Sequence, residues 1–266
     1  MLELYHARVS TCSVKVRLVL AEKELEWTSR EVDLLAGQQH DPDYVLLNPG
    51  HVVPTLVDDG KILVESTLIN EYLDDAYPDP PLRPAAADQR HAMRAWTKLL
   101  DEKIHVAIGV LTYAIGMRPV ILAGNPGEFK KRLQQVPEPA KREGLLSIIE
   151  HGVESPLIPG AVATVVGLLD RVDEALEHAD WLAGEHWSLA EACVLPCVLR
   201  VDNLALGSLL SPDRRPRLAE WYDRVRARPS FAEAVTTWVP PEIVELIHSN
   251  GELVREQVEA MAGESN

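Results

Sequence analysis

Ser10-Thr11-Cys12-Ser13 places three hydroxyls and a thiol in consecutive positions. These residues follow a short apolar run and precede a helical pattern of apolar residues that reaches about residue 24. The sequence therefore predicts that they lie where a strand passes into the N-terminus of a helix. Unpaired N–H groups and a partial positive charge make that end of a helix favourable for an anion, and a thiolate is such an anion.

Two kinds of chemistry fit this stretch. Cys12 could act as a nucleophile or exchange disulfides, because residues 10–13 overlay a Cys-x-x-Cys redox window. Serine fills both cysteine positions of that window, which favours a packing or supporting role for Cys12. The alternative is a hydroxyl that stabilises the thiolate of a bound thiol. One charge-assisted hydrogen bond supplies roughly 1.5–3 kcal/mol, enough to lower a thiol pKa by about two units.

The other two cysteines indicate no metal site. Cys193 and Cys197 are four residues apart and share one helix face, but no His or acidic residue stands at ligand spacing. We expect both to be small core residues.

Composition narrows the class of protein. The chain has 266 residues, 46% of them hydrophobic, and a formal charge of −15. There is no basic stripe, which argues against nucleic acid or an anionic membrane as a partner. Three cysteines fit a reducing compartment. We find no signal pattern and no apolar run of roughly 18 residues, so we expect a soluble, cytoplasmic protein without a membrane span.

The first 80 residues predict a small α/β unit. Apolar and alternating runs predict strands at 2–6, 27–34, 54–57 and 61–64. Helices are expected from residue 10 to about 24 and from 67 to 77, the second with Ser66 as its N-cap. The order is β-α-β, a connection, then β-β-α.

A proline-rich segment separates this unit from a helical remainder. Four of the residues from 78 to 84 are prolines, which cannot continue a helix. We therefore predict domains at 1–79 and 88–266 with a linker at 80–87. Expected helices are 88–115, 162–178, one opened by the capping box Ser188-Leu189-Ala190-Glu191, 216–226 and 242–262, with a frayed tail at 263–266.

Four motifs occur in order along the chain: the Ser10-Thr11-Cys12-Ser13 segment, the loop from Asn48-Pro49 to Val53-Pro54, the pair Glu65-Ser66, and the Ser188 capping box. Together they resemble the cytosolic glutathione S-transferase superfamily over nearly the whole chain, and the first is similar to its zeta class. The resemblance implies an α/β thioredoxin-like N-terminal domain, an all-α C-terminal domain, glutathione as co-substrate and a homodimer.

A narrower resemblance points to the bacterial glutathione-dependent β-aryl etherases of the F type. It is carried by residues 64–67, 82–84, 93–98 and the segment around 136–139. Those enzymes displace an aryloxide from an ether beside a ketone. The chain departs from them at the Ser-Thr-Cys-Ser segment. It also departs from the wider family at His51, usually Gly, and at Val52, where many members have Lys or Gln.

The resemblance implies roles for individual residues. Ser10, with Ser13 as its rival, would donate to the glutathione sulfur, and Thr11 and Cys12 would lie beside it. A cis bond between Val53 and Pro54 would let Val53 offer its backbone N–H and C=O to the tripeptide. The γ-glutamyl ammonium would meet Glu65, and its carboxylate would meet Ser66. Because Val52 has no polar side chain, His40, Gln39 or Lys15 would replace its usual contact with the glycine carboxylate.

The second substrate is expected to be a hydrophobic electrophile held between the domains. Candidate residues are Tyr113, Ile108, Met117 and Trp96, although core packing is the favoured role of Trp96. We expect a glutathione transferase that attacks this electrophile, with β-aryl ether cleavage as the sharper hypothesis. The alternatives are glutathione-dependent cis–trans isomerisation of the maleylacetoacetate type and non-catalytic glutathione binding.

Overall fold

The computed structural model describes residues 1–263, which divide into two compact units. Unit 1 comprises residues 1–97, 179–196 and 223–240, and unit 2 comprises residues 98–178, 197–222 and those from 241 onward. The chain therefore enters each unit three times. The predicted domains at 1–79 and 88–266, with their linker at 80–87, stay a prediction. The frayed tail was predicted at 263–266, but Gly263 is helical, and residues 264–266 lie outside the described part.

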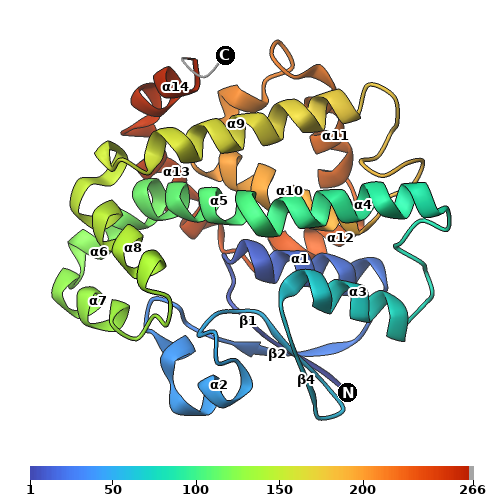
Figure 1. Ribbon diagram of the computed structural model, residues 1–266, viewed down its shortest axis with the longest axis horizontal. Helices are drawn as coiled ribbons and strands as arrows, with labels where there is room; N and C mark the ends of the chain where they lie inside the picture. The colour runs from blue at the N-terminus through green and yellow to red at the C-terminus, as the bar shows by residue number, and fades with distance from the viewer. Residues whose placement is uncertain (264–266) are drawn as a thin grey trace. The chain divides into compact units, whose positions relative to one another are not determined.

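Unit 1 contains the predicted mixed sheet, with strand order β2-β1-β3-β4 (Figure 1). The strands are β1 (Leu2–His6), β2 (Trp27–Glu31), β3 (Thr55–Asp58) and β4 (Lys61–Val64). Strand β1 runs parallel to β2 and antiparallel to β3, and β3 runs antiparallel to β4. The predicted β-α-β and β-β-α halves are confirmed. Strand β2 ends at Glu31, three residues earlier than predicted.

Helix α1 is an interior helix of unit 1. It follows β1, and every residue from Ser13 to Ala21 is buried. It packs against α3 and against the π-helical segment η6, and Figure 1 shows α1 and α3 side by side. The helical elements of unit 1 are α1 (Thr11–Glu22), η1 (Gln38–His40), α2 (Pro42–Leu47), α3 (Ser66–Ala76), most of α4 (Ala87–Leu99), the start of α10 (Leu189–Asn203), α12 (Pro229–Phe231) and η6 (Ala232–Thr236).

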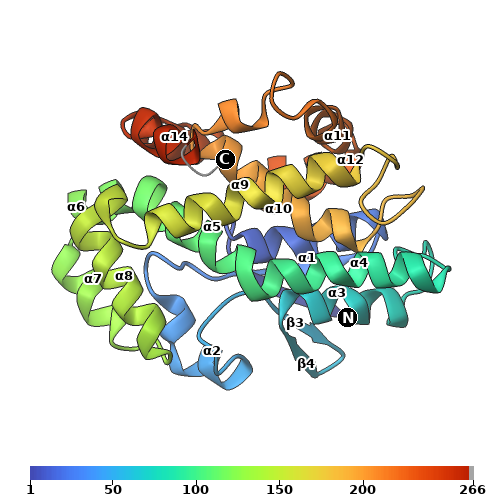
Figure 2. The same cartoon turned by 45° about the horizontal axis from the view of Figure 1, so that its top comes forward.

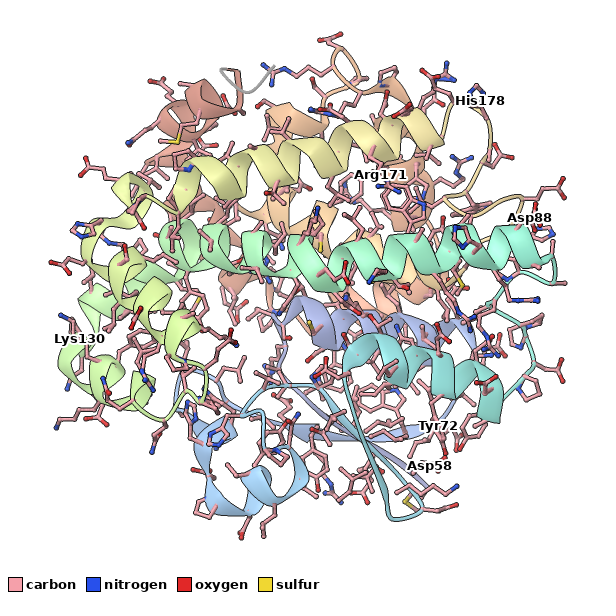
Figure 3. All side chains as sticks on the ribbon, viewed as in Figure 1. Asp58, Tyr72, Asp88, Lys130, Arg171 and His178 are labelled. Atoms are coloured by element: carbon pink, nitrogen blue, oxygen red, sulfur yellow. The ribbon has the colours of Figure 1, made fainter. Side chains whose placement is uncertain are left out.

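Asp58 attaches the end of β3 to α3. Its carboxylate accepts hydrogen bonds from the hydroxyls of Tyr72 at 2.8 Å and Tyr77 at 3.1 Å. Asp58 and Tyr72 lie together in Figure 3. The bond to Asp58 raises the pKa of Tyr72 to about 12, so the phenol stays protonated and donates.

A buried ion pair fastens the proline-rich segment to α1 and α3. Lys23 Nζ lies 2.8 Å from Asp74 and also donates to the carbonyls of Tyr77 and Pro80 at 2.7 Å each. Asp74 accepts from the backbone N–H of Leu82 at 2.8 Å. Each charge thus has hydrogen bonds beyond its partner, which buried ion pairs need to offset desolvation.

The predicted capping box is confirmed at the start of α10. Ser188 Oγ accepts from the N–H of Ala190 at 3.2 Å, and Glu191 accepts from the N–H and the hydroxyl of Ser188 at 2.8 Å each. Glu191 also accepts from the N–H of Leu182 at 2.6 Å. Complete burial raises the pKa of Glu191 to about 7 despite these donors.

Unit 2 is helical. Helices α5 and α9 pack along each other. Figure 2 shows both helices, and α6, α7 and α8 connect them in the chain. Its elements are η2 (Leu100–Ile104), α5 (His105–Leu111), η3 (Thr112–Met117), α6 (Arg118–Ala123), α7 (Pro126–Leu133), α8 (Pro139–His151), η4 (Gly152–Glu154), α9 (Ile158–Ala175), the end of α10, η5 (Gly207–Leu210), most of α11 (Pro216–Arg226), α13 (Pro241–Glu252) and α14 (Arg255–Gly263).

One helical stretch bears on the expectation that the chain has no membrane span. The helical stretch Ala87–Ala123 contains an 18-residue window that is long and apolar enough to cross a membrane by length and composition. Core helices of soluble proteins pass the same test, so this finding is weak support for a span.

The last predicted helix, 242–262, is two helices. Helix α13 ends at Glu252 and α14 begins at Arg255. Gly251 lies so close to the backbone of Leu204 that a Cβ atom there would be 2.1 Å from its carbonyl oxygen. The turn forms at this close approach, while the apolar periodicity continues across it and reads as one helix.

Candidate functional site

The sheet register brings the separate sequence motifs to one end of the sheet. Tyr5 near the end of β1 pairs with Thr55 at the start of β3, and Thr55 pairs with Val64 at the end of β4. The segment that follows β1, the segment that precedes β3 and the segment that follows β4 therefore all lie at the same end of the sheet. These segments are residues 7–13, 51–54 and 65–66.

Ser10 is the N-cap of α1 and retains a hydrogen to donate. Its Oγ accepts from the N–H of Ser13 at 3.2 Å, and its backbone φ of −71° and ψ of 122° are those of a cap residue. A hydroxyl that accepts in this way can still donate its own proton. Capping and donation to a ligand are therefore compatible at Ser10, which is partly exposed.

Ser13 is differently placed. It is fully buried, and its Oγ accepts from the backbone N–H of Ala7 at 3.2 Å. Its hydroxyl thus ties the start of α1 to the turn after β1. Cys12 and Thr11 occupy the first turn of α1 and are partly exposed.

Val53 presents unpaired backbone groups. The Val53-Pro54 bond is cis, as the resemblance implied. Around it, the hydroxyl of Tyr44 and the amide of Asn48 donate to the carbonyl of Val52 at 2.6 and 3.0 Å. Within residues 1–263 the N–H and C=O of Val53 itself make no hydrogen bond. A pair of such groups suits the backbone of an extended peptide.

Glu65 and Ser66 stand at the N-terminus of α3. The helix begins at Ser66 rather than Thr67, so Glu65 and not Ser66 is its N-cap. Glu65 is exposed and has a φ of 68°, a conformation that non-glycine residues adopt mainly at turns and ligand-binding sites. The first bond of the helix is that from the N–H of Ile69 to the carbonyl of Glu65, at 2.8 Å. The amide end of α3 beside Glu65 is suited to a carboxylate.

His51, which the sequence interpretation mentioned only as a departure, is coupled to His40. Their Nδ1 atoms lie 2.9 Å apart, so one ring donates and the other accepts. When the amide nitrogen of Gln39, 3.2 Å from Nε2 of His40, is the donor, the hydrogen of His40 is on Nδ1 and that of His51 is on Nε2. The φ of 54° at His51 is a left-handed conformation that glycine adopts more easily than histidine.

Lys15 and Val52 are less suitable than the histidine pair for a contact with the glycine carboxylate of glutathione. Lys15 is 2% exposed and lies in the interior of α1. Val52 is partly exposed but offers no polar side chain.

Sequence interpretation assigned no functional role to a buried polar cluster beneath the turn after β1. Arg17 donates to Nδ1 of His6 at 2.9 Å, and since a guanidinium can only donate, the ring hydrogen of His6 is on Nε2, 2.8 Å from Ser29 Oγ. Burial, reinforced by Arg17, lowers the pKa of His6 to about 4. Burial lowers the pKa of Arg17 to about 9. Trp238 packs edge-on to His6, 4.7 Å between ring centres.

The residues proposed for the electrophile separate into core and surface. Trp96 is a core residue whose indole N–H donates to the carbonyl of Leu182 at 3.0 Å, and Ile108 is 2% exposed. Met117 is partly exposed. Tyr113, also partly exposed, lies 6.4 Å from Phe129 between ring centres, and burial of its hydroxyl raises its pKa. The expected core positions of Cys193 and Cys197 are confirmed.

Comparisons with known proteins identify the family of the chain. Two family profiles match, Glutathione S-transferase N-terminal domain over residues 4–81 and C-terminal domain over 153–224. Protein LigF of Sphingobium sp. is 30% identical over 237 residues, 87% of this chain and 92% of the relative. The crystal structure of beta-etherase LigF from Sphingobium sp. strain SYK-6 matches with a TM-score of 0.80 and 30% identity, covering 89% of this chain and 99% of that chain.

A probable maleylacetoacetate isomerase of Vibrio cholerae is 28% identical over 237 residues, 87% of this chain and 94% of the relative. The family profiles together include the Ser10, Val53 and Glu65 segments and the Ser188 capping box. The chain therefore belongs to the glutathione S-transferase family, whose enzymes use glutathione as their co-substrate.

Proposed function

We propose that the protein activates glutathione as a thiolate through Ser10 and directs it at a β-aryl ether. The observation that carries the proposal is Ser10 itself, a partly exposed cap hydroxyl with a proton left to donate at the N-terminus of α1. The similarity to beta-etherase LigF over 87% of the chain supports the substrate class.

The magnitude of the effect is sufficient. A free thiol titrates near 8.5, so roughly 3% is thiolate at pH 7. A hydrogen bond to a charged sulfur contributes about 1.5–3 kcal/mol, and a helix N-terminus adds about 0.3–1 kcal/mol. Together they lower the pKa of a bound thiol by about two units, which makes thiolate the major form at neutral pH. The burial of Ser13 favours Ser10 as the donor.

Glutathione would bind in an extended form along the end of the sheet. The backbone N–H and C=O of Val53 would pair with its cysteinyl backbone, and Pro54 would hold that segment. Glu65 would meet the γ-glutamyl ammonium, and Ser66 with the amide end of α3 would meet the γ-glutamyl carboxylate. His51 Nε2–H, steadied by His40, would donate to the glycine carboxylate in place of a side chain at Val52.

The reaction is a displacement. The thiolate sulfur forms a bond to the ether carbon beside the ketone, and the bond from that carbon to the aryl oxygen breaks with its electron pair. The aryloxide leaves and takes a proton from solvent to become a phenol.

Incubation with glutathione and a β-aryl ether ketone tests the proposal. We expect released phenol and glutathione thioether in equal amounts. Ser10→Ala should lower kcat/KM about 100-fold at neutral pH and raise the pKa of the bound thiol, read from thiolate absorbance in the ultraviolet. Absence of phenol would exclude ether cleavage, and parental activity in Ser10→Ala on every accepted substrate would exclude the Ser10 mechanism.

Isomerisation is the second candidate, favoured by the zeta-like segment at residues 10–13 and by the similarity to the Vibrio cholerae isomerase. Turnover of a maleyl substrate without consumption of glutathione would support it. A protein that binds glutathione, shown by a thermal shift, but turns over neither substrate would be a non-catalytic binder.

The protein is further proposed to be a cytoplasmic homodimer. Support for a dimer comes from an apolar patch on β4 and the first turn of α3, two elements in contact. The patch residues Ile62, Val64 and Leu68 are 47%, 37% and 64% exposed. Exposed apolar side chains on two elements in contact are a surface that a second copy of the chain could cover.

A further inference from the structure

Arg17 directs its donors at the backbone that leads to Ser10. It is 1% exposed, and its Nη1 and Nη2 atoms donate to the carbonyls of Ala7 and Arg8 at 3.3 and 2.9 Å. Nη1 also donates to His6. Three consecutive residues at the end of β1 thus each offer one acceptor to one guanidinium.

The same turn is tied to α1 by two further bonds. The carbonyl of Ala7 accepts from the N–H of Ser10 at 3.2 Å, and the N–H of Ala7 donates to Ser13. Ala7 is therefore fixed at its carbonyl by Arg17 and at its N–H by Ser13. Because Ser10 hydrogen-bonds to Ala7, displacement of that carbonyl displaces the cap residue.

The fourth contact of Arg17 reaches η6. The N–H groups of Trp238 and Val239 both donate to Val235, and that of Thr237 donates to Ala232, so no bond from these three reaches the carbonyl of Ala234. Arg17 Nε donates to this carbonyl at 2.7 Å. The ring of Trp238 also lies 5.8 Å from the guanidinium carbon.

The acceptors around Arg17 indicate that this residue orients the backbone and does not mainly stabilise the fold. All four acceptors are neutral, and within the described residues Arg17 makes no ion pair with a carboxylate. Glu31 acts on Arg17 only through space, and burial still lowers the pKa of Arg17, so this buried cation is costly compared with an apolar side chain of the same volume. A rigid fork of donors, however, can hold several carbonyls at fixed angles, which neither an apolar side chain nor lysine can do.

We propose that Arg17 is the positioning residue for Ser10: it holds the turn 7–8 against η6 and so sets the direction of the Ser10 hydroxyl toward the glutathione sulfur. The proposal rests on the proposed function of Ser10. It assigns no contact between Arg17 and glutathione.

Arg17→Lys and Arg17→Met test this role through the pKa of the glutathione thiol in the complex, titrated by thiolate absorbance. We expect the pKa to rise by about one unit in Arg17→Met and less in Arg17→Lys, with kcat/KM at neutral pH about tenfold lower in Arg17→Met. KM for glutathione should change less than about twofold, because Glu65, Ser66 and Val53 are untouched. If Arg17→Met does not fold, the thiol pKa measured with Arg17→Lys tests the proposal by itself.

Arg228→Met is the matched control. Arg228 joins the 223–240 segment to the other end of α1, by bonds of 2.7 and 2.6 Å to Glu22. The Arg228→Met substitution should lower the melting temperature of the protein and leave the pKa of the bound glutathione thiol unchanged. Folded Arg17 variants with the parental thiol pKa would overturn the proposal, provided that Ser10→Ala raises it. If Ser10→Ala leaves the thiol pKa unchanged, the Ser10 mechanism fails first, and the role of Arg17 fails with it.

Discussion

At the scale of the residue, one oxygen atom combines structure and proposed chemistry. Ser10 Oγ accepts from Ser13 and so completes the first turn of α1, while its proton is left for a ligand. Accepting a hydrogen bond polarises the hydroxyl and strengthens the bond that it donates. A residue that caps its own helix also has its side chain held in place before any ligand arrives.

The histidine pair leads to a prediction about glutathione affinity. His51→Ala removes the proposed Nε2–H donor to the glycine carboxylate, so KM for glutathione should rise about tenfold while kcat stays within about twofold. Initial rates at varied glutathione measure both. The control is His91→Ala, which removes an exposed imidazole from α4. An unchanged KM in His51→Ala would assign the carboxylate to another residue.

The buried His6 makes stability depend on pH. Its pKa of about 4 in the folded protein lies below the ordinary 6.5, because burial and Arg17 disfavour the imidazolium. The unfolded chain therefore binds more protons between pH 6.5 and 4, and the stability present above 6.5 is lost as pH falls through that window. The shift corresponds to about 3 kcal/mol.

Chemical denaturation at several pH values measures this loss. His6→Gln keeps an acceptor for Arg17 but cannot be protonated, so its free energy of unfolding should fall less steeply from pH 6.5 to 4.5. Glu31, whose pKa is lowered by Arg8, also loses stability as pH falls towards 4.5, but both proteins carry it, so the difference between their slopes reports His6. Equal slopes in the parent and His6→Gln would contradict the assignment.

At the scale of the element, the stability of α10 depends on the Ser188 capping box at its N-terminus. Ser188 is 1% exposed and both accepts from Ala190 and donates to Glu191. Ser188→Ala should lower the free energy of unfolding by about 1–2 kcal/mol. Thr164→Ala on α9, where the hydroxyl bonds only the carbonyl of Gly160, should change it by less than about 0.5 kcal/mol. A Ser188→Ala loss no larger than the Thr164→Ala loss would contradict the prediction.

Elements whose signals are local were predictable. Helix α11 begins at Pro216 and ends at Arg226 as predicted, because proline starts it and polar residues flank it. The four strands and the Ser188 capping box also follow from nearby residues. The π-helical segments η2 and η3 were not predicted, because one extra residue per turn leaves the apolar pattern helical.

The site was predictable only in part. Its motifs are short and lie within the first 66 residues, so spacing and resemblance located Ser10, Val53 and Glu65. The positive φ at Glu65 and His51 left no signal in residue type, since both are ordinary L-residues. The contact of Arg17 with Ala234 joins residues 217 apart, and no local pattern encodes it.

At the scale of the whole molecule, the apolar patch on β4 and α3 leads to a prediction about assembly. Leu68→Glu would bury a charge in the proposed dimer interface and should weaken the dimer at least about 100-fold. Light scattering across a dilution series measures the mass. Leu253→Glu, at a position 80% exposed, is the control and should keep the parental mass. A Leu68→Glu protein that stays dimeric at every dilution would place the interface elsewhere.

The threefold entry of the chain into unit 1 has a consequence for synthesis on the ribosome. The first strand and α1 are made early, yet Arg17 obtains its contact with Ala234 only 217 residues later. At ordinary elongation rates that interval lasts roughly 10–40 s. During it, the nascent chain has no Trp238 to pack on His6 and Arg17. The N-terminal segment therefore waits for the C-terminal one before the turn that carries Ser10 is complete.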